Sequence, residues 1–515
     1  MLCSLVLLVY AGCTPWEDLE WDVGVSAPLV RTVLGIEHIV PDTIGYTDEQ
    51  GMAGIDFKYK VFELNQDTLF RLDEALTDLA YHLPLTITLQ PGQHFINTLE
   101  ETTFGFQGAE IRTLVIDRGS ILLTLTNPLE EVLVCEYSIP GSSKGGSPLK
   151  VTATVPAASG NAPGKLSKVV DVSGYTINLT GSNGFGVNQI NVQIDTRVAQ
   201  NGQPVQVTPF DTLRIRADFS DLTLKEAHGY FGQHHIQTGK QSTRLDLFDM
   251  ISHGDLIPDT LSARIRIQNG AGFDLRIKLH ELTARNSKTN TTVSLQDPFI
   301  GAPVNISRAT RNQSTGTVTP VEQVITLNPA TTKQMFSIYP DHLDWDLDME
   351  VNPLGNMSMG NDFMFADHPV RAWFELLIPL RLNLNQLTLQ QQLDFYYSSS
   401  GVHSGTLYLI ADNRFPFDAT VALVLLDENG QAVDSLQPAG TILAATGHPT
   451  GNPTSTRTIL TIPVDEERMS ALTRARTIDL EVMLNTVPVG EYVAIRADDY
   501  MNLIISTNLN ATINP

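Results

Sequence analysis

Three aspartates are the first candidates for metal chemistry in this chain. They occupy alternate positions in the stretch "HLDWDLDMEV": Asp344, Asp346 and Asp348. Carboxylate oxygens suit calcium, but an EF-hand loop beginning at Asp344 would need Gly at its sixth position and Glu at its twelfth, where Met349 and Gly355 stand. Because alternate residues of a strand share a face, the pattern predicts a strand with one acidic and one apolar side. A weak cation site is the alternative.

The densest group of histidines lies in "EAHGYFGQHH", residues 226–235, and comprises His228, His234 and His235. Zinc requires three or four converging ligands, and a glycine-rich turn could bring these rings together with Glu226. The Gly-Tyr-Phe-Gly core equally suits a turn with packed aromatic residues. We therefore expect no metal or other cofactor, and keep the three histidines and three aspartates as the alternative metal ligands.

Two glycine-rich stretches match enzyme motifs only in part. "GSSKG" (141–145) has the Gly-x-Ser-x-Gly spacing of a nucleophile elbow, which works only between a strand and a helix, yet an alternating, strand-like stretch follows it. "GNAPGKLS" (160–167) has three residues between its glycines where a phosphate-binding loop has four, and Leu166 replaces the magnesium-binding Ser or Thr. We predict no catalytic residues and no enzyme activity.

The chain has three cysteines, Cys3, Cys13 and Cys135. Cys135 lies in the alternating stretch "EEVLVCEYSI" with acidic neighbours. A reactive thiolate needs electropositive surroundings, so the pattern predicts a buried free thiol.

A short apolar run at residues 5–9 precedes "YAGC" (10–13), in which two small residues stand directly before Cys13. This stretch resembles the lipobox of bacterial lipoproteins. The resemblance implies removal of residues 1–12 as a signal peptide and attachment of a lipid to Cys13. Two features depart from the pattern: Tyr10 stands where Leu is usual, and no Lys or Arg precedes the run. The alternative is the first strand of a soluble fold, but the following "TPWEDLEWD" is acidic and typical of a tether.

The residues after Cys13 indicate which membrane the lipid would enter. Thr14 is not the Asp that resembles an inner-membrane retention signal, and the acids Glu17, Asp18 and Glu20 are similar to the export tags of surface lipoproteins in the Bacteroidota. The resemblance therefore implies the outer membrane, on its periplasmic or cell-surface side. After residue 13, no apolar stretch approaches the ~20 residues that span a bilayer.

The charge balance excludes one class of partner. The chain has 57 acidic and 33 basic residues and a formal net charge of -24. Nucleic-acid affinity comes mainly from Lys and Arg that displace counterions, so we expect no nucleic-acid partner.

Three passages share an alternating strand, an asparagine, a short turn and a second alternating strand. The asparagines are Asn127, Asn269 and Asn413, and the intervals from 127 to 269 and from 269 to 413 are 142 and 144 residues. Such a period is normal for tandem domains. Because an Asn side chain bonds to nearby backbone, we predict that these residues form strand corners and have a structural role.

The Asn-Pro junction between the two strands of the first passage resembles the core of LEA14/WHy-type envelope and desiccation domains. The second and third passages lack the proline. The resemblance implies a β-sandwich and permits a bound hydrophobic ligand.

Short apolar runs between frequent turn residues predict an all-β chain of tandem β-sandwich domains, Ig-like or LEA14-like, with a few short helices. The expected helices are 67–80, from its leucine spacing, and 465–475, which opens with acidic residues. The predicted limits are a signal peptide at 1–12, a lipid-anchored lead segment or N-terminal domain at 13–104, and sandwich units at 105–250, 251–400 and 401–515.

These features together predict a membrane-anchored cell-envelope lipoprotein with a structural, scaffold or binding role in an envelope assembly. Its expected partners are the membrane, through a lipid on Cys13, and envelope proteins or a glycan. One alternative is a carrier of lipid or another hydrophobic ligand. Another is a glycan-binding or glycan-degrading surface subunit, which would need exposed aromatic residues; the candidates are Trp345, Trp373, Tyr396 and Tyr397, whose apolar neighbours equally suit a core. The sequence identifies no ligand-binding residues.

Overall fold

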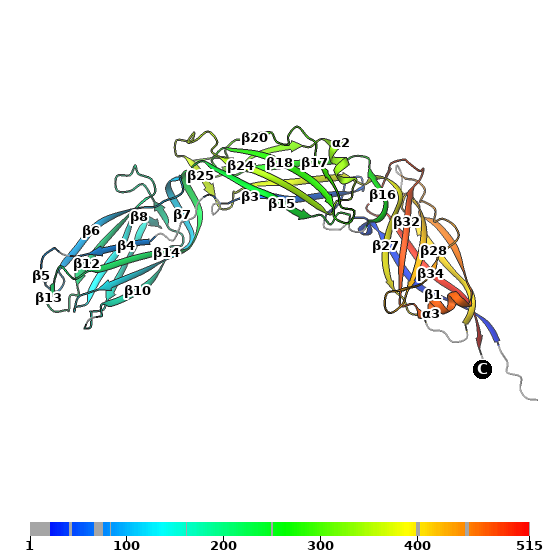
Figure 1. The fold of residues 1–515 in the computed structure, drawn as a ribbon, viewed down its shortest axis with the longest axis horizontal. Helices are drawn as coiled ribbons and strands as arrows, with labels where there is room; N and C mark the ends of the chain where they lie inside the picture. Colours follow the sequence, from blue (N-terminus) through cyan, green and yellow to red (C-terminus); the bar gives the residue numbers. More distant parts are fainter. Residues whose placement is uncertain are drawn as a thin grey trace, which may run out of the picture.

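Three two-sheet sandwiches, the tip, middle and base modules, follow one another along a curved, elongated molecule (Figure 1). In this computed structural model, the described residues are 21–513 without 41–43, 66–68, 70–75, 83, 161, 249–250, 398–401 and 449–452. Strands make up 62% of the structure and helices 5%. The predicted all-β fold of tandem β-sandwiches is therefore confirmed.

The tip module lies at the left in Figure 1. Its strands are β4 (Leu76–Tyr81), β5 (Ile87–Leu89), β6 (His94–Thr103), β7 (Glu110–Asn127), β8 (Leu133–Lys144), β9 (Ser147–Val155), β10 (Gly164–Asp171), β11 (Thr176–Asn178), β12 (Gln189–Val198), β13 (Val205–Val207) and β14 (Leu213–Tyr230). One sheet has the order β4-β14-β7-β10, and the other has the order β6-β12-β8-β9. Strand β11 pairs with both β7 and β8, and β5 pairs with β13 at the outer end.

The middle module repeats this arrangement. Its elements are β2 (Gly45–Thr47), β3 (Ala53–Leu64), β15 (His234–Arg244), β17 (Ser262–Asn269), β18 (Leu275–Asn286), β19 (Thr291–Ser294), β20 (Pro303–Ile306), β21 (Thr310–Arg311), β22 (Val318–Thr319), β23 (Val321–Thr326), α2 (Pro329–Phe336), β24 (His342–Val351), β25 (Asp362–Phe365) and β26 (Val370–Pro379). The sheet orders are β3-β26-β17-β23 and β15-β24-β18-β20.

The base module has the same plan. Its elements are β1 (Trp21–Gly35), η1 (Ile36–His38), β16 (Ile251–Pro258), β27 (Arg381–Asp394), β28 (Val402–Asn413), β29 (Phe417–Leu426), β30 (Ala432–Leu436), β31 (Thr456–Val464), α3 (Glu466–Arg474), β32 (Thr477–Thr486), β33 (Val493–Ala494) and β34 (Tyr500–Ile513). The sheet orders are β1-β34-β28-β31 and β27-β32-β29-β30, and β16 adds to the second sheet beside β27.

The modules are nested in the chain. The chain places β1 in the base module, β3 in the middle module and β4 in the tip module, completes the tip module, and then returns to finish the middle and base modules. Strand β1 thus pairs with β34 far along the chain, with Ala27 opposite Thr507. The sheets consequently do not follow the linear limits expected from the sequence, because the stretch 13–104 supplies edge strands to all three modules.

Alternation of apolar and polar residues explains why these segments are strands. In β12, β24 and β32, buried and half-buried residues alternate along all ten positions. One side of each strand faces the space between two sheets and the other faces solvent. Most buried apolar side chains of the modules form one continuous core, and a small separate cluster comprises Ala309, Val318, Phe363 and Phe365.

The helices match those expected from the sequence in one place and differ from them in two. Helix α3 lies within the expected 465–475, and the Asp465 side chain caps it by accepting a hydrogen bond from the Arg468 N–H. The expected helix at 67–80 is wrong for residues 76–80, which belong to β4, because pairing with β14 outweighs the helical leucine spacing. Helix α2, which the apolar pattern did not indicate, begins with Pro329 after the capping residue Asn328.

Candidate functional site

The repeated asparagines Asn127, Asn269 and Asn413 form identical corners in the three modules. Each ends a strand of the first sheet, has an exposed fraction of 0%, and precedes a strand of the second sheet. Each Nδ2 donates to the carbonyl four residues ahead and to a distant carbonyl, and each Oδ1 accepts from the N–H two residues ahead, at 2.8–3.0 Å. The predicted structural role of these residues is confirmed.

The corner of the middle module is covered by the connection from the tip module. The Phe231 ring packs on the Phe273 ring of the corner loop, with centroids 5.5 Å apart, and both side chains have exposed fractions of 0%. The Phe231 N–H donates to Asp362 Oδ2 at 3.2 Å, and the Asn352 Nδ2 donates to the same oxygen at 2.8 Å. This joint is a packed and hydrogen-bonded interface.

The middle and base modules meet in a similar joint. Three backbone hydrogen bonds of 2.9 Å link the segments around Ala53, Leu380 and Ile495, one donated by each residue. Leu380 and Ile495 are buried, as is Phe417 in the corner loop of the base module. In both inner modules, therefore, the corner end is covered by the next module outward.

The corner of the tip module lies at the free end of the molecule. Glu130 and Glu131 follow the corner asparagine by three and four residues. Gly272 and Phe273 occupy the same two positions in the middle module. Glu130 is exposed and Glu131 half-buried. A polar outer surface is expected of the last unit in a row, since no further unit covers it.

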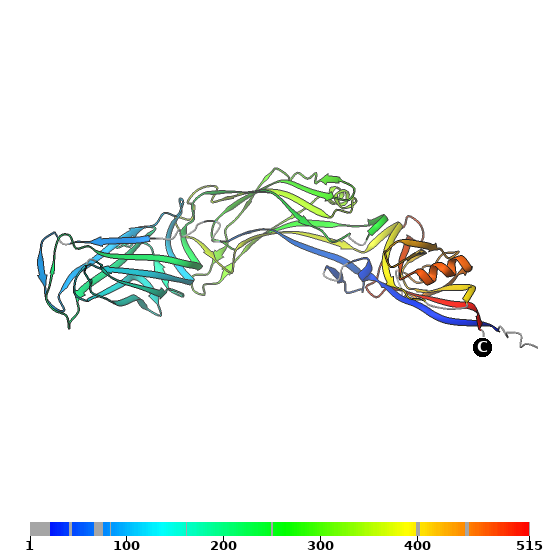
Figure 2. The ribbon, with the colours of Figure 1, turned by 60° about the horizontal axis from the view of Figure 1, so that its bottom comes forward.

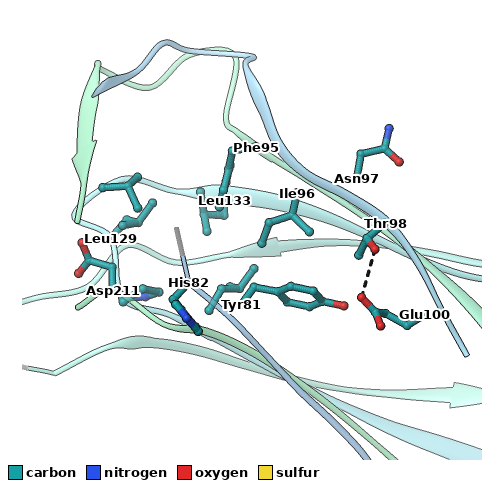
Figure 3. A pocket seen from close by; sticks show the side chains of 13 residues that line it. Tyr81, His82, Phe95, Ile96, Asn97, Thr98, Glu100, Leu129, Leu133 and Asp211 are labelled. Carbon is teal, nitrogen blue, oxygen red and sulfur yellow. Dashed lines mark hydrogen bonds between the residues drawn. The ribbon is translucent and has the colours of Figure 1, made fainter. Parts of the chain in front are cut away.

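A cavity of about 400 Å³ opens beside this corner, between β4 and β6 (Figure 3). Its apolar walls come from Phe95, Ile96, Leu129, Leu133, Val207 and Leu213. Its polar groups include Tyr81, His82, Thr98, Glu100 and Asp211. This size and mixed lining are typical of a ligand site.

Two of the polar groups of the cavity, Glu100 and Asp211, are carboxylates. The Thr98 hydroxyl donates to Glu100 Oε1 at 3.1 Å, and Asp211 Oδ2 accepts from the Thr208 N–H at 2.7 Å. Burial raises the pKa of the Tyr81 hydroxyl, and the nearby Glu100 charge raises it further. Tyr81 therefore remains a protonated donor, while Glu100 and Asp211 present acceptors. The cavity suits an apolar group that lies beside a cation or a hydrogen-bond donor.

Large apolar side chains are exposed on the segments around the cavity. Leu85 has an exposed fraction of 68%, Ile87 of 37% and Phe210 of 94%. Ile87 pairs with Val207 of the cavity wall, and Phe210 directly precedes Asp211. Exposed apolar residues gathered at a cavity mouth favour a binding surface.

The three aspartates of β24 do lie on the outward side of that strand, but each faces different groups. Asp344 accepts hydrogen bonds from Ser242 and Arg285, and Asp348 lies 2.8 Å from His280 and 3.3 Å from His235. Burial alone would raise the pKa of Asp348, but the hydrogen bonds from the two histidines lower it. Asp346 lies between them, opposite Lys240.

The candidate histidines are also separated by their contacts. His228 lies 3.2 Å from Glu226, His234 Nε2 is 2.7 Å from the Phe231 carbonyl, and His235 contacts Asp348. Within the described residues, no group of three or more His, Cys, Asp or Glu side chains is placed to hold a metal ion.

The remaining candidates have structural settings or lie outside the described residues, except Tyr396, which is 76% exposed with the Arg476 guanidinium carbon 5.5 Å from its ring; Tyr397 packs partly against the core. Cys135 is a buried free thiol as predicted, and "GSSKG" forms the end of β8 and the first residue of the turn to β9, with no helix after it. Trp345 is buried, and the Trp373 ring lies 4.7 Å from both Lys58 Nζ and the Arg266 guanidinium carbon. Cys13 and its lipobox lie outside the described residues.

Sequence reasoning missed the tip cavity because no motif marks it. The available signal was the comparison of the three corner loops, in which only the first carries two glutamates. A larger depression, of about 630 Å³, lies on the base module, where Gln390 Nε2 donates to Glu481 Oε1 at 2.9 Å. The tip cavity is the better candidate because it coincides with a difference between otherwise equivalent modules.

The chain matches no protein-family model and no curated protein. Among solved structures, it is similar to a candidate secreted protein from Parabacteroides distasonis, at 14% identity and a TM-score of 0.28. The similarity covers 53% of this chain and 82% of the other. No helix in the described part of the chain is long and apolar enough to cross a membrane.

Proposed function

We propose that this protein is a lipid-anchored arm of the cell envelope that holds a binding tip away from its membrane. In this proposal, Cys13 carries the lipid on the periplasmic or cell-surface side of the outer membrane, and the tip cavity contacts an envelope partner. The role is one of binding and scaffolding, with no catalysis.

One observation carries the proposal: strand β1, which follows Cys13 in the sequence, and the tip cavity lie at opposite ends of the molecule. Trp21, which begins β1, follows Cys13 by eight residues and pairs with Ile513 in the base module. Both ends of the described chain therefore lie at the base, and the tip module lies farthest from them (Figure 2). A lipid at Cys13 would attach the base to the bilayer and leave the tip free.

Two joints support the arm because each is built of buried contacts. The tip and middle modules share Phe231 and the pairing of β14 with β25, while the middle and base modules are linked by the backbone hydrogen bonds around Ala53, Leu380 and Ile495. Interfaces of packed apolar side chains and strand pairing resist bending. A stiff arm would hold the tip at a set distance from the membrane.

The anchor is tested by replacing the cysteine that would carry the lipid. Full-length protein with Cys13→Ala, expressed in a bacterium that makes lipoproteins, should leave the membrane fraction and lose incorporation of labelled fatty acid. Cys135→Ala is the matched control and should change neither measurement. Equal membrane partition of the Cys13→Ala variant and the parent protein would contradict the proposal.

A further inference from the structure

Strand pairing identifies equivalent positions at the outer ends of the three modules. The last strand of each module has a buried apolar residue at its first or second position, namely Leu213, Val370 or Met501. Their partners on the neighbouring edge strand are Tyr81, Leu64 and Leu34, respectively. Leu64 and Leu34 are buried, whereas Tyr81 is half-buried and lines the tip cavity.

The segment after this position contributes a buried aliphatic side chain to the core in both inner modules. Five residues after Leu34 and Leu64 come Ile39 and Leu69, whose exposed fractions are 4% and 2%. Five residues after Tyr81 comes Thr86, which is exposed, and Leu85 beside it is 68% exposed. Among the described residues of this segment, the tip module has no buried aliphatic side chain at the sequence position of its two counterparts, and the preceding residues Tyr81 and His82 line the cavity.

A polypeptide segment is the occupant that the other modules indicate. In both inner modules the aliphatic group comes from a stretch of chain that follows the edge strand, and in the middle module Phe231 adds a second side chain from a connecting segment. The edge strand β6 beside the cavity has no strand partner on its outer side among the described residues, so an extended segment can lie along it.

The charge around the cavity indicates the composition of the segment. Glu100 and Asp211 line it, and Glu130 and Glu131 lie on the adjacent corner loop. Opposite charge on a partner lowers the free energy of the complex and speeds association. Basic residues on either side of an aliphatic side chain therefore fit the site best.

We propose that the tip cavity binds an extended segment of a partner protein, taking up an aliphatic side chain flanked by Lys or Arg, in the position that Ile39 and Leu69 occupy in the other two modules. This inference rests on the proposed role of the tip as a binding end.

The test measures fluorescence anisotropy of labelled hexapeptides with the full chain carrying Cys13→Ala, so that it does not depend on the anchor. The probe is Lys-Lys-Leu-Ile-Lys-Lys, with Lys-Lys-Ser-Ser-Lys-Lys and Glu-Glu-Leu-Ile-Glu-Glu as comparison peptides. The first should bind about tenfold or more tightly than either comparison peptide, since each exchange removes the apolar contact or the charge attraction.

Variants of the cavity locate the binding. Thr98→Trp fills the cavity from β6 and should weaken binding about tenfold or more. Val169→Trp, at a residue of the same module that is 69% exposed on the opposite edge, is the matched control and should bind as the parent does. Asp211→Asn should weaken binding and reduce its salt dependence, whereas Glu428→Gln in the base module should do neither. Circular dichroism verifies that each variant is folded.

Any of three results would overturn the inference. The first two are equal binding of all three peptides and unchanged binding by the folded Thr98→Trp variant. The third is binding of dodecylamine in the cavity with no peptide binding, which would assign the site to a free amphiphile. Retention of peptide binding together with unchanged membrane partition after Cys13→Ala would refute the anchor and leave this inference standing. Release of the Cys13→Ala variant from the membrane, together with a lack of peptide binding, would support the anchor and refute this inference.

Discussion

The corner asparagines offer the sharpest test of how the modules are stabilised. In the tip module, Asn127→Ala would leave three polar groups without their partner: the buried N–H of Leu129 and the partly buried carbonyls of Glu131 and Pro156. A buried polar group that loses its hydrogen bond costs about 1–3 kcal/mol. Taking values near the lower end, we expect a loss of about 3–5 kcal/mol in the free energy of unfolding of this module.

Hydrogen exchange followed by mass spectrometry can measure this loss in each module separately. The tip module is one continuous stretch of chain, so it can open while the others stay folded. A loss of about 3 kcal/mol corresponds to an increase of more than a hundredfold in the opening equilibrium. Peptides from β8 and β9 should therefore exchange more than a hundredfold faster in Asn127→Ala, whereas peptides from β34 should not change.

Two further substitutions make the test specific. Asn413→Ala should give the reverse pattern, with faster exchange in the base module. Asn127→Asp keeps the acceptor for the Leu129 N–H but directs a carboxylate at two carbonyl oxygens, so it should destabilise the module at least as much as alanine at neutral pH. Exchange in β8 and β9 that rises less than threefold in Asn127→Ala would refute the reasoning that these hydrogen bonds hold the corner.

Two other predictions concern buried titratable groups. Asp499 lies beside His448, Arg414, Arg496 and Asp498, and burial raises its pKa from 3.8 to about 6. Because the folded-state pKa is the higher one, the protonated carboxyl contributes about 3 kcal/mol to the free energy of unfolding. This contribution is complete below pH ~4 and is lost as the pH rises through 6. In urea titrations, Asp499→Asn should therefore gain stability relative to the parent between pH 5 and 7.5, and a relative loss would contradict the sign. Burial also raises the pKa of the Cys135 thiol to about 11, so an aromatic disulfide reagent at pH 8 should label it only after denaturation; rapid labelling of the folded chain would show that this thiol is accessible.

Local patterns predicted much of the fold because they reflect local physics. Alternation identified β24 with its acidic face, and the repeated asparagines marked the three strand corners. Alternation does not specify which strand pairs with which, however, and Ala27 meets Thr507 only because the middle and tip modules intervene between them. The helical spacing of Leu76 and Leu79 was misleading for the same reason, since their pairing with β14 decides their conformation.

The candidate site was less accessible to sequence reasoning. Leu85 and Thr86 beside the cavity are exposed, whereas Ile39 and Leu69 of the other two modules are buried, and this difference becomes visible only when the modules are compared in space. Glu130 and Glu131 indicate that the first corner lies at an exposed end. This interpretation, however, requires the knowledge that the other two corners are covered.

The nesting of the modules has a mechanical consequence. The chain passes through the joint between the tip and middle modules once on its way out and once on its way back, so a single proteolytic nick in either passage would leave the tip tethered by the other. A pull between a membrane and the tip would also strain β1 lengthwise against β34 over fourteen paired positions. All of those hydrogen bonds would have to shear together before the base could unravel.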